Sequence, residues 1–358
     1  MIGPRSLHYV TLQAGLEALS LSGLARWATP RAGGLGAILT VHHVRPARPG
    51  GFRPNRILEI TPEFLDKLLA RLARTGVEFV SLEEAGRRLA AGTGRRFVCL
   101  TFDDGYRDNV VYARPILTRY GAPWTLFVTT DFAEQRGELW WLALEAAIGR
   151  AVRLDIDLGR GRQSFDCRTA KAKWRSWSAI YWRLRALDEA ALRAAVRDLA
   201  AQVGIEMAPF CRELCLDWDE LAALKDDPLV SIGAHSVTHA RLAKLPLAEA
   251  EAEMRTSRDL IEARLGVRPT AFAYPVGDRG SAAEREFMLA RALGYRMAVT
   301  TRPGVLRAAD AQHPHSLPRL SLNGLFQRPR YIEALLSGLP FLPLRASRSA
   351  GRASASSE

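Results

Sequence analysis

Short runs of consecutive apolar residues recur along most of the chain, separated by segments in which apolar positions have helical spacing. Runs of this length are typical of buried parallel strands. They lie at 37–41, 77–80, 97–102, 123–128, 229–234, 270–274 and 296–300, with a last strand and turn at 316–324. The clearest helix start is Thr61 at the N-cap with Pro62 in the first helical position. This alternation predicts an α/β fold with a parallel sheet or (β/α) barrel.

The alternation stops between residues 132 and 228. Segments 172–187 and 189–203 have a helical pattern, and six of the eight tryptophans lie in this stretch. Because the stretch connects two predicted strands, we expect a largely helical insertion on the face where the carboxyl ends of the strands meet.

Both ends of the chain lie outside the alternating pattern of strands and helices. Residues 1–34 contain an amphipathic helix at 7–28 and a glycine-rich linker, and residues 345–358 have the composition of a disordered tail. The helix lies either on a membrane surface or on the main domain, and we expect the latter. No signal peptide or membrane-spanning run is evident, which predicts a cytoplasmic protein. Residues 35–344 form the predicted main domain.

The net charge of +12, from 50 Lys and Arg against 38 Asp and Glu, favours anionic partners. The basic residues are spread along predicted helices without a compact block, so we expect no nucleic-acid partner. The four cysteines form no close-spaced metal motif, and Cys99 lies inside a buried run as a small apolar residue.

Two adjacent carboxylates follow the apolar run 97–102. Asp103 and Asp104 are succeeded by Gly105, which permits a tight turn that brings both side chains to one site. A buried carboxylate needs a partner, and a cation is the simplest one. The other interpretation is an ordinary turn with a helix N-cap.

A second polar cluster follows the run 229–234. His235 and His239 have the i,i+4 spacing that places two imidazoles on one face of a helical turn. Together with the aspartate pair they offer three ligands and one spare carboxylate. Three protein ligands with an open position indicate a catalytic metal site rather than a structural one.

The sequence Thr101-Phe102-Asp103-Asp104-Gly105, followed by His235-Ser236-Val237-Thr238-His239, resembles the first two motifs of the polysaccharide deacetylases. These are the family 4 carbohydrate esterases, which share the nodulation-protein-B homology domain. Tyr274-Pro275-Val276-Gly277 resembles the third motif. The resemblance implies a distorted (β/α) barrel of about seven strands, with the insertion on the active-site face.

Site roles also follow from this resemblance. Asp104, His235 and His239 would hold one divalent metal ion, with zinc as our first choice and cobalt, nickel or manganese as alternatives. Asp103 would be the general base. The backbone amide of Tyr274 would help to hold the oxyanion.

The general acid and the residue that orients the base are less directly indicated. In one branch of the family, a strand of the form aliphatic-Met-Tyr-His-x-Val supplies the acid. Leu39-Thr40-Val41-His42-His43-Val44 is similar in frame, which selects His42, with His43 and His315 as alternatives. Many members carry an Arg in the third motif. None stands there in this chain, and Arg268 and Arg279, which flank the motif, could substitute.

The activity implied by the resemblance is hydrolysis of N-acetyl groups on amino-sugar residues of a polysaccharide or oligosaccharide, with release of acetate. Trp140 and Trp141 would stack on sugar rings or pack the insertion onto the barrel. A metal-dependent phosphoesterase is one rival, although it would need more ligands for a second metal. A degenerate carbohydrate-binding domain is another, but it would not need the spare carboxylate.

Overall fold

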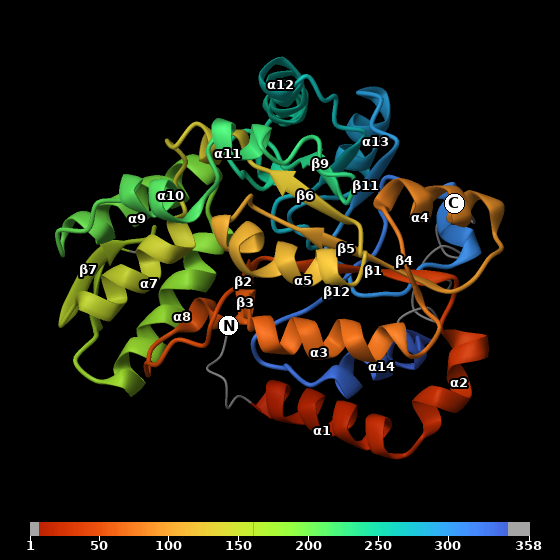
Figure 1. Ribbon diagram of the computed structural model, residues 1–358. Coiled ribbons are helices and arrows are strands. Elements are labelled where there is room, and N and C mark those ends of the chain that lie inside the picture. Colours follow the sequence, from red (N-terminus) through yellow and green to blue (C-terminus); the bar gives the residue numbers. More distant parts are fainter. Residues whose placement is uncertain (1–6, 160, 343–358) are drawn as a thin grey trace, which may run out of the picture.

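The computed structural model describes residues 7–159 and 161–342, and its centre is a parallel sheet that curves into a distorted (β/α) barrel (Figure 1). Around the sheet the strand order is β11-β10-β9-β6-β5-β1-β12, and β4 pairs with the start of β5. The strands are β1 (Gly36–Val41), β4 (Glu78–Phe79), β5 (Phe97–Phe102), β6 (Trp124–Val128), β9 (Val230–Ala234), β10 (Ala271–Ala273), β11 (Met297–Val299) and β12 (Leu320–Ser321). The expected barrel of about seven strands is confirmed.

One segment, residues 314–321, joins the two edges of the sheet. Leu317 pairs in parallel with Val299 of β11, and Leu320 pairs with Leu39 of β1. The amide of Thr300 donates to the Leu317 carbonyl at 2.9 Å. The segment therefore closes the barrel and brings residues from the far end of the chain beside β1 and β5.

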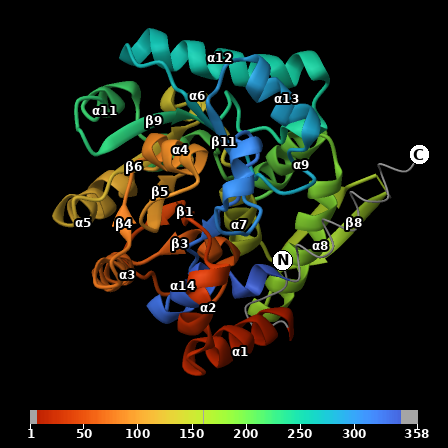
Figure 2. The same cartoon turned by 90° about the vertical axis from the view of Figure 1, so that its right-hand side faces the viewer.

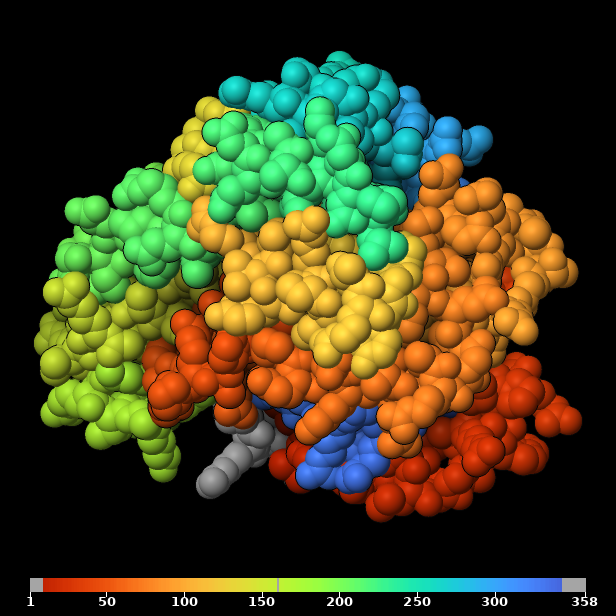
Figure 3. All heavy atoms as spheres, in the orientation of Figure 1, coloured from red at the N-terminus to blue at the C-terminus, as the bar shows by residue number. Residues whose placement is uncertain are grey.

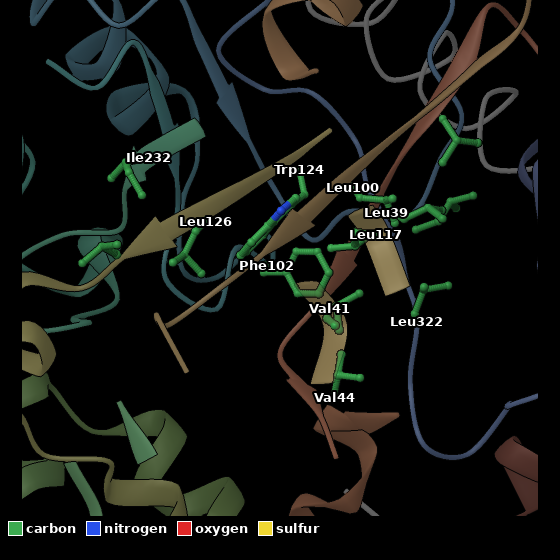
Figure 4. Packing of buried hydrophobic residues seen from close by; sticks show 14 of the residues in the cluster. Leu39, Val41, Val44, Leu100, Phe102, Leu117, Trp124, Leu126, Ile232 and Leu322 are labelled. Atoms are coloured by element: carbon green, nitrogen blue, oxygen red, sulfur yellow. The ribbon is translucent and has the colours of Figure 1, made fainter. Parts of the chain in front are cut away.

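Helices cover the outside of the barrel, and their apolar faces pack on the outward positions of the strands. Figure 4 shows part of this core, in which Val41, Phe102, Trp124 and Leu126 come from three neighbouring strands. Thr61 caps α3 as expected, since its hydroxyl accepts from the amide of Phe64 at 3.2 Å. The helices are α3 (Pro62–Ala73), α4 (Leu82–Ala91), α5 (Arg114–Arg119), α6 (Thr130–Ala133), α12 (Leu247–Leu265), α13 (Glu284–Ala292) and α14 (Pro329–Leu336).

Several short elements occupy the connections. They are β2 (His43–Val44), β3 (Glu59–Ile60), η1 (Pro54–Leu58), η2 (Asn109–Ala113), η3 (Leu242–Lys244), η4 (Ala308–Gln312) and η5 (Leu339–Phe341). Of these, η2 is a single π-helical turn directly after the Asp103 loop. Such turns occur frequently at functional sites.

The insertion between β6 and β9 forms a second layer with its own core, which includes the fully buried Trp177 and Leu192. It is helical for the most part, but the expectation missed an antiparallel hairpin, β7 (Arg153–Asp157) with β8 (Arg162–Asp166). Apolar and polar residues alternate in β7, which is the strand signal that was overlooked. The helices are α7 (Trp140–Arg150), α8 (Ala170–Ala186), α9 (Glu189–Ala201), α10 (Ala208–Leu214) and α11 (Trp218–Ala222).

The N-terminal segment forms two helices, α1 (Leu7–Leu21) and α2 (Leu24–Ala32), rather than one helix over 7–28. Gly23 separates them with a φ of 73°, a left-handed conformation that glycine adopts at no steric cost. Both views show α1 beside α14 at one end of the molecule (Figures 1 and 2), as docking on the domain predicts. No helix in the described part of the chain has the length and apolarity needed to span a membrane. The predicted tail at 345–358 lies outside the described residues.

Candidate active site

Strand alternation and one unusual backbone conformation bring the two aspartates together. Along β5 the side chains of Cys99 and Thr101 face the barrel interior, so Asp103, two residues further on, faces it as well. The next residue would point outward in a regular strand. Asp104 instead has a φ of 72°, a strained conformation for a residue other than glycine. Both carboxylates therefore lie at the same end of the barrel, 1% exposed.

Asp104, His235 and His239 form a cluster with the geometry of a metal site. Oδ1 of Asp104 lies 3.3 Å from Nε2 of His235 and 3.2 Å from Nε2 of His239. The three ligand atoms all lie within 4.8 Å of one another. Ligand atoms of a tetrahedral ion with bonds of about 2.1 Å stand about 3.4 Å apart, so these spacings fit one ion. Oδ1 of Asp104 is also buried without a hydrogen-bond donor, which suits a cation ligand.

The two histidines converge through a loop, so the expected helical turn is wrong. Strand β9 ends at Ala234, and Ser236 and His239 have φ values of 65° and 60°. The Ser236 hydroxyl accepts from the amide of His239 at 3.0 Å. From α12, Glu253 accepts hydrogen bonds from the amides of residues 237 and 238 at 2.8 and 2.9 Å. These bonds hold a strained loop in the one shape that aims both rings at Asp104.

The orientation of the His235 ring is fixed by a second contact. Its Nδ1 lies 2.7 Å from the carbonyl oxygen of Ala273, which accepts the ring proton. Nε2 is then the nitrogen left with a lone pair, and it faces Asp104. Backbone carbonyls commonly orient metal-binding histidines in this way.

The charges in the cluster favour a cation. Burial raises the pKa of Asp104, but His239 and His235 outweigh it and hold that pKa well below its usual value. For His235, burial lowers the pKa, and the carboxylates of Asp104 and Asp103 more than reverse the effect. Positive charge is therefore stabilised between these side chains.

Asp103 makes a bidentate ion pair with Arg319. Nη1 and Nη2 of Arg319 donate to the two carboxylate oxygens of Asp103 at 2.7 Å each. Nη1 also donates to Thr101 Oγ1 at 3.0 Å, and Nε donates to the Thr300 carbonyl at 2.9 Å. Burial raises the pKa of Asp103, and the positive charge of Arg319 brings it below its usual value. Asp103 is thus held as an oriented carboxylate beside the three-residue cluster.

Arg319 was not among the arginines expected from the sequence, which were Arg268 and Arg279. Arg268 and Arg279 are exposed, and Arg268 pairs with Glu262. Arg319 lies in the segment that closes the barrel, 216 residues from its partner. A lone arginine between leucines in the predicted strand at 316–322 was the available signal, because a buried guanidinium needs a carboxylate.

The neighbouring histidines His42 and His43 have different surroundings. His43 is 1% exposed; its Nδ1 lies 2.7 Å from Asp108 and its ring stacks on Tyr106. His42 is only partly buried, and the carbonyl of its backbone accepts from Asn109 at 2.8 Å. Burial lowers the pKa of His42, while the nearby charges of Asp104 and Asp103 raise it in part.

Two other predicted residues have contacts that bear on their roles. The amide of Tyr274 donates to the Val299 carbonyl at 3.2 Å, so it takes part in the pairing of β10 with β11. The imidazole of His315 lies 2.8 Å from the carbonyl of Tyr295, which precedes β11. His315 is therefore at the amino end of the strands, opposite the carboxylates.

Trp140 and Trp141 are 5% and 6% exposed and belong to the core of the insertion. The Trp141 ring lies 4.9 Å from that of His239, centroid to centroid. The Trp140 ring stacks on Tyr181 at 5.9 Å. These contacts support the packing interpretation, and Trp141 forms one wall of the metal cluster.

The chain belongs to the polysaccharide deacetylase family, since the family model described as polysaccharide deacetylase matches residues 90–298. No curated protein matches the chain. His42 and Arg319 both lie outside the matched range.

Solved structures share the fold at low sequence identity. The Streptococcus pyogenes deacetylase PplD, in complex with acetate, is 21% identical with a TM-score of 0.56, covering 84% of this chain and 97% of that one. IcaB from Ammonifex degensii is 18% identical with a TM-score of 0.52, covering 85% and 97%. The polysaccharide deacetylase BC0361 from Bacillus cereus is 15% identical with a TM-score of 0.53, covering 84% and 68%.

Proposed function

We propose that this protein is a metal-dependent hydrolase that removes N-acetyl groups from amino-sugar residues of a polysaccharide or oligosaccharide. The observation that carries the proposal is the second carboxylate, Asp103, held by Arg319 beside the Asp104, His235 and His239 cluster. A cluster that only bound a metal or a sugar would not need an oriented carboxylate next to it. Family membership and the likeness to PplD, which was solved with acetate, support the same reaction.

Asp104, His235 and His239 would hold a divalent ion, for which zinc is our choice. Such an ion polarises a carbonyl oxygen and lowers the pKa of a water molecule that binds to it. Asp103 accepts the proton of the attacking water. Because Arg319 donates a hydrogen bond to each oxygen of Asp103, the carboxylate keeps one orientation while it does so.

His42 donates a proton to the nitrogen of the departing amine. An amide nitrogen leaves as a neutral amine only if it is protonated, so the reaction needs an acid in addition to the base. His42 follows β1, the strand that pairs with β5 along its full length. The hydrogen bond from Asn109 to its backbone carbonyl fixes the loop that carries it. The amide of Tyr274 is the weaker part of the proposed site, because as an oxyanion donor it would share its proton with the Val299 carbonyl.

The products are acetate and a free amino sugar, so both can be measured in one reaction. The experiment is acetate release from a panel of N-acetylated glycans by protein treated with a chelator and then supplied with zinc, cobalt, nickel or manganese. The panel includes chito-oligosaccharide, a lipid-linked exopolysaccharide precursor and a cell-envelope glycan. We expect release that requires added metal. Metal-loaded protein that releases no acetate but hydrolyses phosphate esters would overturn the proposal.

A further inference from the structure

The two N-terminal helices carry an unusual concentration of exposed apolar side chains. Twelve large hydrophobic residues are exposed in the described part of the chain, and five of them lie between residues 10 and 27. These five, which we call the N-terminal patch, are Val10 (51% exposed), Leu12 (43%), Leu21 (69%), Leu24 (54%) and Trp27 (69%). Single exposed apolar residues need no explanation, but a group of this kind marks an interaction surface.

Among residues 9–21, whose side chains the structure describes, the outward side of α1 is also free of charge. Its other exposed residues are Thr11, Gln13, Ala14, Gly15 and Ala18. The one carboxylate of this helix, Glu17, is directed toward α14, where it pairs with Arg328 and Arg330 and accepts from the hydroxyl of Tyr331. The inner side of α1 thus docks on the domain through these polar contacts and through the ring of Tyr9, which lies 6.2 Å from that of Phe326, and its outer side is left uncharged. Figure 3 shows the two helices, in red, at the lower edge of the molecule.

Basic residues surround the N-terminal patch. Arg26 and Arg31 of α2 are exposed, and the guanidinium of Arg31 lies 5.7 Å from the ring centroid of Trp27. Arg328 and Arg330, at the start of α14, keep 51% and 35% of their side chains exposed. Helices α1 and α2 and residues 328–331 therefore carry four arginines and a single carboxylate, Glu17, so their net charge is positive.

We propose that the N-terminal patch docks the protein on the surface of a bilayer that contains anionic phospholipids, with α1 and α2 lying in the interface. Helices with an apolar face, tryptophan at its edge and arginine around it bind membranes in this orientation. The apolar side chains enter the headgroup region, and the guanidinium groups pair with lipid phosphates. A second copy of the chain fits less well, because a two-fold contact would place the same basic rim against itself.

Vesicle flotation tests this proposal without reference to catalysis. The full chain is mixed with vesicles of phosphatidylcholine alone, or with about one lipid in three replaced by phosphatidylglycerol. We expect flotation with the anionic vesicles, and weaker flotation as salt is added. The variant Leu21→Glu with Trp27→Glu should bind at least about tenfold more weakly, and so should Arg26→Glu with Arg31→Glu. All four side chains are exposed, so the fold and acetate release should be unchanged.

Two exposed apolar residues elsewhere provide a matched control. Val152 and Met288 are 65% and 64% exposed and lie outside the patch. Val152→Glu with Met288→Glu should float like the unmodified protein. Equal flotation of the patch and control variants, or no flotation of the unmodified protein, would overturn the proposal. A dimer that Trp27→Glu dissociates, without vesicle binding, would assign the patch to a second copy instead.

Discussion

Replacing Arg319 by Gln should damage the protein in two separable ways. The substitution removes both hydrogen bonds to Asp103 and the bonds to Thr101 and the Thr300 carbonyl. The Asp103 carboxylate would remain, buried and without its partner. We therefore expect a loss of stability from the unpaired charge and a loss of turnover from the misplaced base.

The size of the stability loss follows from the burial of the pair. The side chains of Arg319 and Asp103 are 0% and 2% exposed, so solvent screens their interaction very little. Removing one partner of a buried ion pair costs about 3–5 kcal/mol. In a chain of this size, that loss lowers the melting temperature on the order of 5 °C.

A double-mutant cycle separates the ion pair from simple loss of packing. Thermal unfolding is measured for Arg319→Gln, Asp103→Asn and the combined variant. Because the combined variant buries no unpaired charge, it should lose less stability than the sum of the losses in the two single variants. We expect a coupling energy, which is the difference between that sum and the loss in the combined variant, of about 2 kcal/mol or more. Arg319→Gln should still retain metal, since Arg319 makes no hydrogen bond to the Asp104 cluster in the described structure.

Additive losses in this cycle would refute the reasoning, and so would normal acetate release by Arg319→Gln. Arg268→Gln is the matched control. Its exposed side chain pairs only with Glu262 among the described contacts, so stability and turnover should be nearly unchanged.

Three further outcomes are expected. Elemental analysis after dialysis should find no metal in the alanine variants of the three proposed ligands, Asp104→Ala, His235→Ala and His239→Ala. Stoichiometric metal in any one of these variants would remove that residue from the ligand set. His42→Ala should keep metal and lower amide turnover by about 10²–10⁴, with a much smaller loss on an activated ester, whose leaving group needs little protonation. Equal losses on the two substrates would exclude the acid role. Burial raises the pKa of Glu59, but Arg45 and Arg48 outweigh burial and lower this pKa from 4.5 to about 2. The ionised Glu59 therefore stabilises the folded protein above pH 4.5, and this contribution is lost as the pH falls toward 2. In denaturant unfolding, the free energy of unfolding of Glu59→Gln should be at most about 3 kcal/mol below that of the unmodified protein at pH 7, and close to it at pH 2. A difference between the two proteins that does not change with pH would contradict this.

The strands, and the residues that gather at the candidate metal site, could be predicted because their signals are local. Each strand is a short apolar run, and the polar residues that follow β5 and β9 must meet at one end of a parallel barrel. Asp103 and His235 follow such runs directly, and Asp104 and His239 come shortly after them. The parallel arrangement of the strands brings these residues to the same end of the barrel.

The conformation of the His235 loop could not be predicted from the spacing. Ser236 and His239 adopt left-handed φ values without glycine, which no propensity favours. The side chains of Ser236 and of Glu253 in α12 accept hydrogen bonds from amides of the loop and so stabilise this conformation, and these bonds depend on the folded loop. The helical turn was the favoured local structure, and tertiary contacts overrode it.

Arg319 could not be identified because its role depends on closure of the barrel. The segment 314–321 must pair with β11 and β1 before its side chain can reach Asp103. The third motif, where the family usually places this arginine, lies far from residue 319 in the sequence. Only the three-dimensional arrangement shows that an arginine from the segment that closes the barrel pairs with Asp103.

The central claim, that Asp103 is the base beside a metal site, is tested most directly by Asp103→Asn. Acetate release from the best N-acetylated glycan is compared between this variant and the unmodified protein, each loaded with one metal ion per chain. The account predicts that the unmodified protein forms one free amine per acetate and that the variant keeps its metal while losing nearly all turnover. Loss of the metal would mean that Asp103 is the metal ligand and Asp104 the base. Full turnover by the metal-loaded variant would show that Asp103 is not the base.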